Sequence, residues 1–203
     1  MELIETMHVT NGNIKNFNYH LERVKKAYEY FKWKFDEKEW VIKLTSSRFQ
    51  VPGSKFQVSK DEFRLRITYS YNGIRNIETF PIQKREFNKF KVIDINFDYF
   101  LKKKNRKHFS ILHSKFSAFD EFILIKNGLV TDTTISNLAF FDSKEWLTPK
   151  YPLLQGTKRA ELIEKGVLKE INIHTSDLKY FEKMAMINAI LGFYVIEEFD
   201  IIR

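Results

Sequence analysis

The 203-residue sequence predicts an α+β protein with two domains. Turn dipeptides between alternating apolar runs recur in both halves of the chain and predict hairpins, and one long amphipathic helix is expected near the N-terminus. The 20 Phe and 9 Tyr residues favour β structure and, with a hydrophobic content of 43%, supply packed cores. We expect a small α+β domain over residues 1–95 and a larger, β-rich domain over 96–203, which carries most of the candidate chemistry.

The first domain is predicted to begin with a strand over residues 3–9, which ends at the turn dipeptide Asn11-Gly12. A helix follows over about 16–33. His20 and Arg23 lie beside its apolar stripe. The stripe consists of five apolar residues that recur at spacings of four and three and therefore share one face: Phe17, Leu21, Val24, Tyr28 and Phe31.

A hairpin is predicted between residues 63 and 82 around Asn72-Gly73, which is the strongest short-range hairpin signal. Apolar and polar side chains alternate along its first strand. One face of the sheet is therefore expected to be buried and the other to be solvated. The solvated face carries Arg64, Arg66 and Thr68.

The second domain is predicted to consist mostly of strands with two short helices. A second Asn-Gly hairpin is expected at Asn127-Gly128, and Gly156 precedes a helix over 159–164. Thr175-Ser176-Asp177 offers caps for another helix over 178–183. Further strands are expected at 91–97, 122–125, 129–133, 138–141, 185–190 and 193–196.

The composition excludes several kinds of site and location. The chain has no cysteine, which excludes disulfides and thiolate metal sites, and no metal site of another kind is predicted. The N-terminus lacks the features of a signal peptide. The longest nearly apolar run, Met184 to Ile196, is shorter than the roughly 18 residues of a membrane span. A cytoplasmic protein without membrane contact is therefore expected.

The formal net charge of +8 favours anionic ligands, which include nucleic acid, phosphate cofactors and carboxylate substrates. Much of the charge lies in residues 102–107, where five of six positions are Lys or Arg. Such a run is ordinary as a solvated loop. Nucleic-acid binding requires a known binding fold or interleaved aromatic residues, and neither is evident. We therefore expect a small anionic amino or carboxylate substrate and no nucleic acid.

Four segments together meet the three requirements of pyridoxal phosphate: an amine for its aldehyde, an acid at its ring nitrogen and a cradle for its phosphate. Lys102 supplies the amine, activated by neighbouring cations, and Asp132 supplies the acid. Gly156-Thr157-Lys158 enters a helix whose first N–H groups suit a phosphate. Arg23 carries a permanently charged guanidinium group, which can donate two hydrogen bonds to phosphate oxygens. Taken singly, each has an ordinary interpretation: a surface lysine, a strand-end carboxylate, a turn and a solvated arginine.

In this order, the segments resemble the motifs of the fold-type IV family, the class IV aminotransferases, over nearly the whole chain. The resemblance implies a two-domain fold similar to D-amino-acid aminotransferase. It also implies that Lys102 is the catalytic Schiff-base lysine, that Asp132 faces the ring nitrogen, and that Arg23 and Gly156-Thr157-Lys158 hold the phosphate. The matched motifs are His20-x-x-Arg23, Lys102-x-x-Asn105-Arg106, Gly128-x-Val130-Thr131-Asp132, Ser136-Asn137, Thr148-Pro149 and Gly156-x-x-Arg159.

Three departures from the family pattern concern the site. Asp132 replaces the family's glutamate and is one methylene shorter. Thr157-Lys158 replaces the more usual Ile/Val-Thr pair. The chain begins at the strand that holds Glu5-Thr6, without the family's opening hairpin. We therefore expect an N-terminally shortened member whose substrate pocket is altered.

The C-terminal segment favours one activity within the family. Aminotransferases tend to carry a threonine-rich segment where this chain has Asn188-Ala189, and an Asn-Ala pair is more similar to 4-amino-4-deoxychorismate lyase. The resemblance therefore implies a lyase that forms 4-aminobenzoate and pyruvate, a step toward folate, with Asn188 at the cofactor and a homodimer as the usual assembly. The alternatives are an aminotransferase of branched-chain or D-amino acids and a non-catalytic pyridoxal-phosphate-binding protein.

Overall fold

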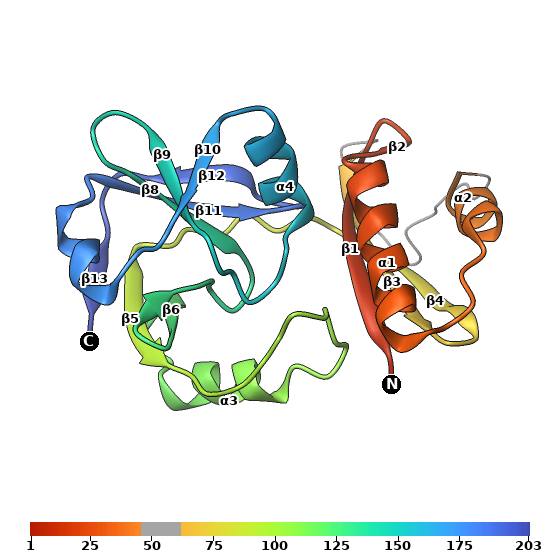
Figure 1. Cartoon of the computed structure of the whole chain (residues 1–203), viewed down its shortest axis with the longest axis horizontal. Helices are drawn as coiled ribbons and strands as arrows, with labels where there is room; N and C mark the ends of the chain where they lie inside the picture. Colours follow the sequence, from red (N-terminus) through yellow and green to blue (C-terminus); the bar gives the residue numbers. More distant parts are fainter. Residues whose placement is uncertain (46–61) are drawn as a thin grey trace. The chain divides into compact units, whose positions relative to one another are not determined.

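The structure is a computed structural model that describes residues 1–45 and 62–203 (Figure 1). The chain divides into two compact units. The first comprises Met1–Lys84 and Leu101–Asn105, and the second comprises Arg85–Phe100 and Arg106–Arg203. In the described part of the chain, no helix is long and apolar enough to cross a membrane.

The first unit is an antiparallel sheet with two helices, and its strand order is β2-β1-β3-β4. The helix α1 (Phe17–Phe31) lies along the sheet in Figure 1, and its side chains share a core with β1, β3 and α2. The other elements are β1 (Leu3–Thr10), β2 (Asn13–Ile14), α2 (Glu37–Thr45), β3 (Glu62–Ser70) and β4 (Gly73–Phe80).

The predicted strand, helix and hairpin of this unit are confirmed, with ends shifted by a few residues. Gly12 and Gly73 have positive φ angles of 75° and 85°, the conformation that their turns require. Val24 and Tyr28 of the predicted apolar stripe are buried in the core. Local spacing was therefore sufficient to predict which side of α1 packs on the sheet.

His20, which was predicted beside the apolar stripe of α1, is fully buried, with 0% exposure, and the spacing of apolar residues did not predict this burial. The cause is a partner on β1, since the Nδ1 of His20 lies 2.6 Å from Oε2 of the buried Glu5. A polar side chain is stable in the core when its hydrogen bonds are made there.

The second face of this sheet is less solvated than the alternation predicts. Arg64 and Arg66 are half-buried, and Thr68 is 1% exposed. The guanidinium carbons of the two arginines lie 4.6 and 5.0 Å from the ring centroid of Phe80. Stacking of this kind shields the planar groups and their stems from water while the charges are kept.

The compact units differ from the predicted domain ranges, 1–95 and 96–203, at two places. The strand β5 (Lys89–Asp94) belongs to the second unit, because it pairs in parallel with β6 (Glu121–Lys126). Residues 101–105 belong to the first unit. There the N–H of Ile4 donates to the carbonyl of Lys102 at 2.9 Å, which adds a short segment beside β1.

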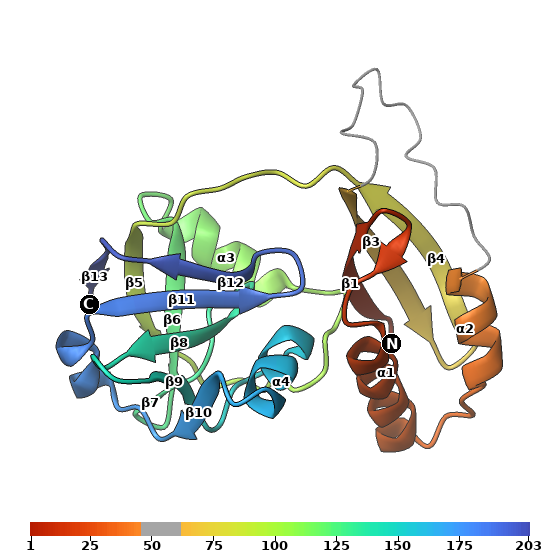
Figure 2. The same ribbon diagram turned by 90° about the horizontal axis from the view of Figure 1, so that it is seen from above.

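The second unit contains two sheets, with strand orders β10-β9-β8-β11-β12 and β13-β5-β6-β7 (Figure 2). Its helices are α3 (Lys107–Lys115), α4 (Thr157–Glu164) and the 3₁₀ helix η1 (Thr175–Tyr180). The remaining strands are β7 (Leu129–Val130), β8 (Asn137–Phe141), β9 (Trp146–Pro149), β10 (Leu168–Ile171), β11 (Lys183–Asn188), β12 (Gly192–Ile196) and β13 (Asp200–Ile202).

The hairpin predicted at Asn127-Gly128 is confirmed, and both residues have positive φ. The helix predicted over 178–183 is wrong. The N–H of His174 donates to Asp177 Oδ2 at 2.8 Å, which closes a short 3₁₀ turn at Thr175, and Lys183 already begins β11 opposite Phe141. The predicted capping residues therefore start a turn three residues earlier and no α-helix follows.

Candidate active site

The loop between β7 and β8, residues 131–136, and the first residue of β8, Asn137, carry a run of buried polar side chains in the second unit. Hydrogen bonds fix the loop, because Thr131 Oγ1 donates to Leu124 O at 2.7 Å and the hydroxyl oxygens of Thr133 and Ser136 lie 2.9 Å apart. Buried polar groups that are bonded in this way hold a loop in one conformation. Six side chains of this run are no more than 7% exposed: Thr131, Asp132, Thr133, Thr134, Ser136 and Asn137.

Asp132 lies in this loop and accepts two hydrogen bonds. Asn137 Nδ2 donates to Oδ1 at 2.7 Å, and the backbone N–H of Leu154 donates to Oδ2 at 2.8 Å. The carboxyl group thereby ties the loop to the turn before α4. Its neighbours leave it buried, with 4% exposure.

Burial raises the pKa of Asp132 to about 7, although the bonds from Asn137 and Leu154 and the charge of Arg159 act in the opposite direction. A carboxyl group with this pKa is partly protonated near neutral pH. A nearby cation would favour its charged form. Strongly shifted carboxyl groups in a polar pocket are typical of functional sites.

Gly156 leaves room for Asn137 rather than adopting a special backbone conformation. Its φ and ψ of −74° and 139° are open to any residue. A Cβ at this position would lie 1.9 Å from Asn137 Oδ1. Asn137 also donates to Leu154 O at 2.8 Å, so its amide is held between the loop and the turn. The glycine therefore supports the bond to Asp132 through Asn137.

The N-terminus of α4 follows Gly156 directly, and no side-chain hydrogen bond caps it. The first N–H groups of a helix have no partner inside the helix and favour an anion. Thr157 is buried there, whereas Nζ of Lys158 lies 2.8 Å from Glu161 Oε2 one turn later. The predicted glycine turn and helix start are therefore present, whereas the Lys158 ammonium forms an ion pair with Glu161 of the same helix.

Arg159 is buried and serves as a clamp within the second unit. Its guanidinium donates to Pro149 O at 2.7 Å, to Glu170 Oε1 at 2.7 Å and to Thr148 Oγ1 at 3.2 Å. These bonds join α4 to the ends of β9 and β10. The predicted Thr148-Pro149 and Gly156-x-x-Arg159 motifs are therefore connected to each other by the hydrogen bonds of Arg159.

In the first unit, Glu5, His20 and Arg23 form a buried cluster. Arg23 binds the Glu5 carboxylate with two nitrogens, Nε to Oε1 at 2.9 Å and Nη2 to Oε2 at 2.6 Å. The Nδ1–H of His20 donates to the same Oε2 at 2.6 Å. Glu5 is 0% exposed, so these partners compensate a charge that is removed from water.

The cluster fixes the charge of its members. Burial by itself raises the pKa of Glu5, but Arg23 and His20 outweigh it and lower the pKa to about 2. Burial lowers the pKa of His20, even though Glu5 acts against this change. Glu5 is therefore a carboxylate, and the imidazole of His20 is neutral at physiological pH. Two donors of Arg23, the predicted phosphate ligand, are engaged with Glu5.

Lys102 lies in the segment beside β1, in the same unit as this cluster. Its side chain is half-buried, and its charge is near enough to lower the pKa of His20. Lys104 by contrast is exposed and pairs with Glu2 at 2.9 Å. Lys103 and Arg106 are half-buried as well, so burial separates Lys102 from Lys104 and Lys107 but not from Lys103.

Asn188, predicted at the cofactor, closes the turn between β11 and β12. Its Oδ1 accepts from the N–H groups of Ile190 and Leu191 at 2.8 and 2.7 Å. Its Nδ2 donates to Ile135 O at 3.2 Å. Asn188 therefore supports the same loop that carries Asp132.

Sequence reasoning gave no role to Glu5 and Glu121, and it named His20 only as part of a motif. Glu121 is 0% exposed, and its Oε1 accepts from the hydroxyl of Thr134 at 2.7 Å, which helps to fix the loop between β7 and β8. Arg106, known from its motif alone, donates to the carbonyl of Thr134. A carboxylate inside an apolar strand, as in Glu5 or Glu121, is the signal that would have indicated a buried partner.

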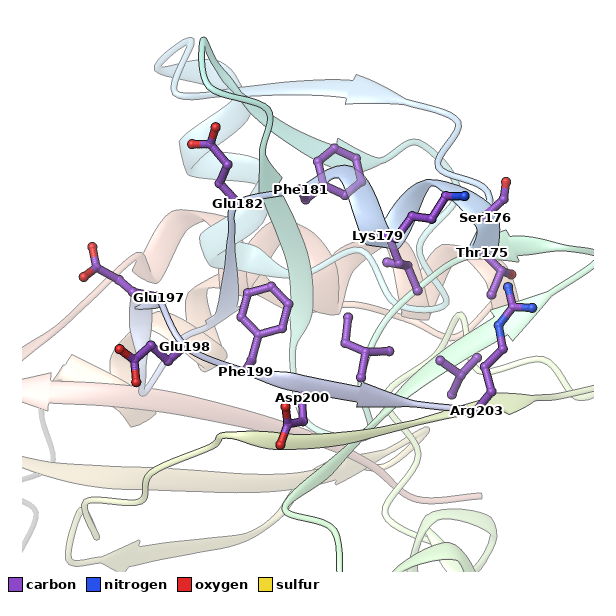
Figure 3. Close-up of a pocket in the computed structure, with 13 residues that line it drawn as sticks. Thr175, Ser176, Lys179, Phe181, Glu182, Glu197, Glu198, Phe199, Asp200 and Arg203 are labelled. Atoms are coloured by element: carbon purple, nitrogen blue, oxygen red, sulfur yellow. The ribbon is translucent and has the colours of Figure 1, made fainter.

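The second unit also contains a cavity of about 880 Å³ that none of the predicted site residues lines. Figure 3 shows Glu182, Glu197 and Glu198 on one side of it and Lys179 and Arg203 on the other. Among the residues that the structure describes, no group of three or more His, Asp or Glu is placed to hold a metal ion.

Residues 2–199 match the family described as amino-transferase class IV. An uncharacterised protein of Haemophilus influenzae is 34% identical over 191 residues, which cover 94% of this chain and 98% of that protein. A candidate aminodeoxychorismate lyase of Schizosaccharomyces pombe is 35% identical over 77 residues, which cover 36% of this chain and 33% of that protein.

Three crystal structures have a similar fold. A candidate 4-amino-4-deoxychorismate lyase of Haemophilus somnus has a TM-score of 0.79 and 30% identity, with 94% of this chain and 97% of that chain covered. A candidate amino-acid aminotransferase of Mesorhizobium loti has a TM-score of 0.82 and 21% identity, with 99% of each chain covered. A fold IV transaminase of Curtobacterium pusillum has a TM-score of 0.77 and 15% identity, with 98% and 79% covered. The predicted fold-type IV architecture is confirmed.

Proposed function

Because the chain belongs to the class IV aminotransferase family of pyridoxal-phosphate enzymes, we propose that it is a lyase that converts 4-amino-4-deoxychorismate to 4-aminobenzoate and pyruvate. The observation that supports cofactor binding most directly is Asp132, a buried carboxyl group that accepts from the backbone N–H of Leu154 in the turn before α4. The choice of a lyase is supported by the Haemophilus somnus and Schizosaccharomyces pombe relatives and by Asn188. A homodimer, the usual assembly in this family, is part of the proposal.

The residues fit pyridoxal phosphate in chemical terms. Burial raises the pKa of Asp132 to about 7 although the charge of Arg159 acts against it, and a protonated ring nitrogen would be a further cation that favours the carboxylate. The N–H groups at the start of α4 suit a phosphate. Lys102 carries the amine that the cofactor aldehyde requires. Arg23, held on Glu5, adds a fixed positive charge.

Bound pyridoxal phosphate supplies an electron sink for the carbon that loses a proton. The residues then have separate tasks. Asp132, whose Oδ1 and Oδ2 accept from Asn137 and Leu154, would hold the ring nitrogen of the cofactor and keep it protonated. Lys102 Nζ, as a neutral amine, accepts the proton that leaves the substrate ring. The departing three-carbon group takes up a proton and becomes pyruvate.

The proposal is tested with purified protein and pyridoxal phosphate. The loaded protein is incubated with 4-amino-4-deoxychorismate while 4-aminobenzoate is followed, beside an assay of amino-group exchange with keto acids. Lys102→Ala should abolish both turnover and borohydride trapping of the cofactor, whereas Lys103→Ala and Lys104→Ala should retain them.

The outcomes separate the alternatives. Formation of 4-aminobenzoate supports the lyase, and exchange with keto acids without it indicates an aminotransferase. Trapping of the cofactor with neither activity indicates a non-catalytic binding protein. A reduced cofactor attached to Lys103 or Lys104 would show that Lys102 is the wrong lysine.

A further inference from the structure

Two arginines on one face of the first unit's sheet, Arg64 and Arg66, have no carboxylate partner among residues 1–45 and 62–203. Nε of Arg64 and Nε of Arg66 are buried and lack a hydrogen-bond partner among the described residues, as does Oγ1 of Thr68 next to them. No ion pair within residues 1–45 and 62–203 includes either arginine. Both arginines are half-buried, and a buried guanidinium nitrogen is normally hydrogen-bonded, so the two adjacent unbonded Nε atoms require an explanation.

The two carboxylates on the same face leave the arginines unpaired. Glu62 lies 2.6 Å from His8 Nε2 and forms an ion pair there when the imidazole is protonated. Glu78 stands opposite Arg66 in the register of β3 and β4, yet it makes no ion pair in the described part of the chain. Burial and the neighbouring charge of Arg66 lower the pKa of Arg64. Both effects act on a cation that forms no ion pair with a carboxylate in the described part of the chain.

Phe80 holds the two guanidinium groups in place. They lie over the same ring, at 4.6 Å for Arg64 and 5.0 Å for Arg66. Stacking fixes a planar group but leaves its N–H donors in the plane unused, and these donors match the two oxygens of a carboxylate. The site is therefore oriented before a ligand arrives, which lowers the entropy lost on binding.

Lys102 belongs to the same face of the same sheet. The N–H of Ile4 donates to Lys102 O, and Leu3 stands opposite Lys103, so Lys102 is the register neighbour of Ile4. Side chains alternate along a strand, and residues that pair across two strands share a face. Ile4 pairs with Thr68, and Thr6, two residues further along β1, pairs with Arg66, so all four lie on the same face. The proposed reactive amine and the two arginines thus lie on one side of one sheet.

We propose that Arg64 and Arg66 form a site for a carboxylate group of the substrate, distinct from the cofactor phosphate. The identity of the ligand as the substrate rests on the proposed function. The presence of a carboxylate site rests only on the two unpaired, stacked guanidinium groups.

Binding of malonate to the cofactor-loaded protein tests the site, with neutral malonamide as the matched probe. Calorimetry should show that Arg64→Gln and Arg66→Gln each weaken malonate binding by about one to two decades, since each removes a charged hydrogen-bond donor. Arg75→Gln, an exposed arginine on β4, should change it less than twofold. Arg66→Lys should recover only part of the loss, because a point charge replaces a fork.

The cofactor absorbance of every variant is recorded in the same experiment. Unchanged malonate affinity in both Gln variants, or equal binding of malonamide, would overturn the proposal while leaving the cofactor and lyase assignments intact. Loss of malonate binding in a protein without lyase activity would support the carboxylate site and refute the proposed reaction. If a Gln variant does not fold, two other measurements test the site. Malonate should bind more weakly to Arg66→Lys, and malonate should protect Arg64 and Arg66 of the wild-type protein from modification by phenylglyoxal.

Discussion

Replacement of Gly156 by alanine should loosen the bond between Asn137 and Asp132. The added Cβ would lie 1.9 Å from Asn137 Oδ1, and ordinary contact begins at 3.4 Å, so the amide must move by about 1.5 Å (3.4 − 1.9). A shift of this size exceeds the tolerance of the 2.7 Å bond to Asp132 and of the 2.8 Å bond to Leu154 O.

The magnitude follows from the bonds lost. A hydrogen bond to a charged group contributes about 1.5–3 kcal/mol and a neutral one about 0.5–1.5 kcal/mol. Alanine also restricts the unfolded chain, which offsets about 0.4–1 kcal/mol, because the backbone conformation at Gly156 is open to it. The free energy of unfolding should therefore fall by about 2–3 kcal/mol, and Tm by roughly 5–10 °C.

Urea and thermal unfolding of the protein without cofactor measure the change. The matched control is Asn137→Ala, in which the obstacle to the Cβ is gone. Adding Gly156→Ala to that variant should lower the free energy of unfolding by less than about 0.5 kcal/mol, because the effect of the alanine depends on the Asn137 side chain. A full cost in the Asn137→Ala background, or no cost in the wild-type background, would refute the reasoning.

Three further predictions concern charge. Asp132→Ala should lower turnover by orders of magnitude while some cofactor still binds, whereas Asp132→Glu should keep more activity; near-normal turnover of the alanine variant would contradict the assignment. Arg23→Ala should weaken cofactor binding by about one to two decades in a spectral titration and Arg23→Lys by less, and an unchanged affinity would limit Arg23 to its pair with Glu5. The pKa of Glu5 is lowered from 4.5 to about 2 in the folded protein, so its charge stabilises the fold above pH 4.5 and this stabilisation is lost as the pH falls toward 2. The expected loss in the free energy of unfolding is about 3 kcal/mol. Urea titrations of Glu5→Gln should not show this pH dependence.

Local signals explain what the sequence could predict. The Asn-Gly turns depend on backbone conformations that their own residues favour, and the buried side of α1 follows from spacing within one helix. Lys102 and Asp132 were indicated by motifs that the family comparison supports as a set. Their individual roles stay predictions.

Features that depend on distant partners were not predictable in this way. His20 is buried because of Glu5, which is 15 residues away, and no property of the helix itself reveals that partner. Gly156 was expected to be part of a phosphate-binding turn, whereas the side chain that a Cβ at this position would meet first is Asn137. The face with Arg64 was expected to be solvated, because alternation alone does not show that Phe80 stacks with it.

The return of residues 101–105 to the first unit links the two compact units by several chain segments. The chain passes between the compact units three times, at 84/85, 100/101 and 105/106, so no single cut separates them. A fragment that ends at residue 95 would lack the segment that pairs with Ile4, and β1 would keep exposed backbone groups at that edge, a common start of aggregation. Lys102 lies between two of the crossings, so any hinge motion must rotate the backbone within a few residues of the proposed reactive amine. Limited proteolysis and hydrogen exchange at 100–106 are therefore direct probes of how such motion is restrained.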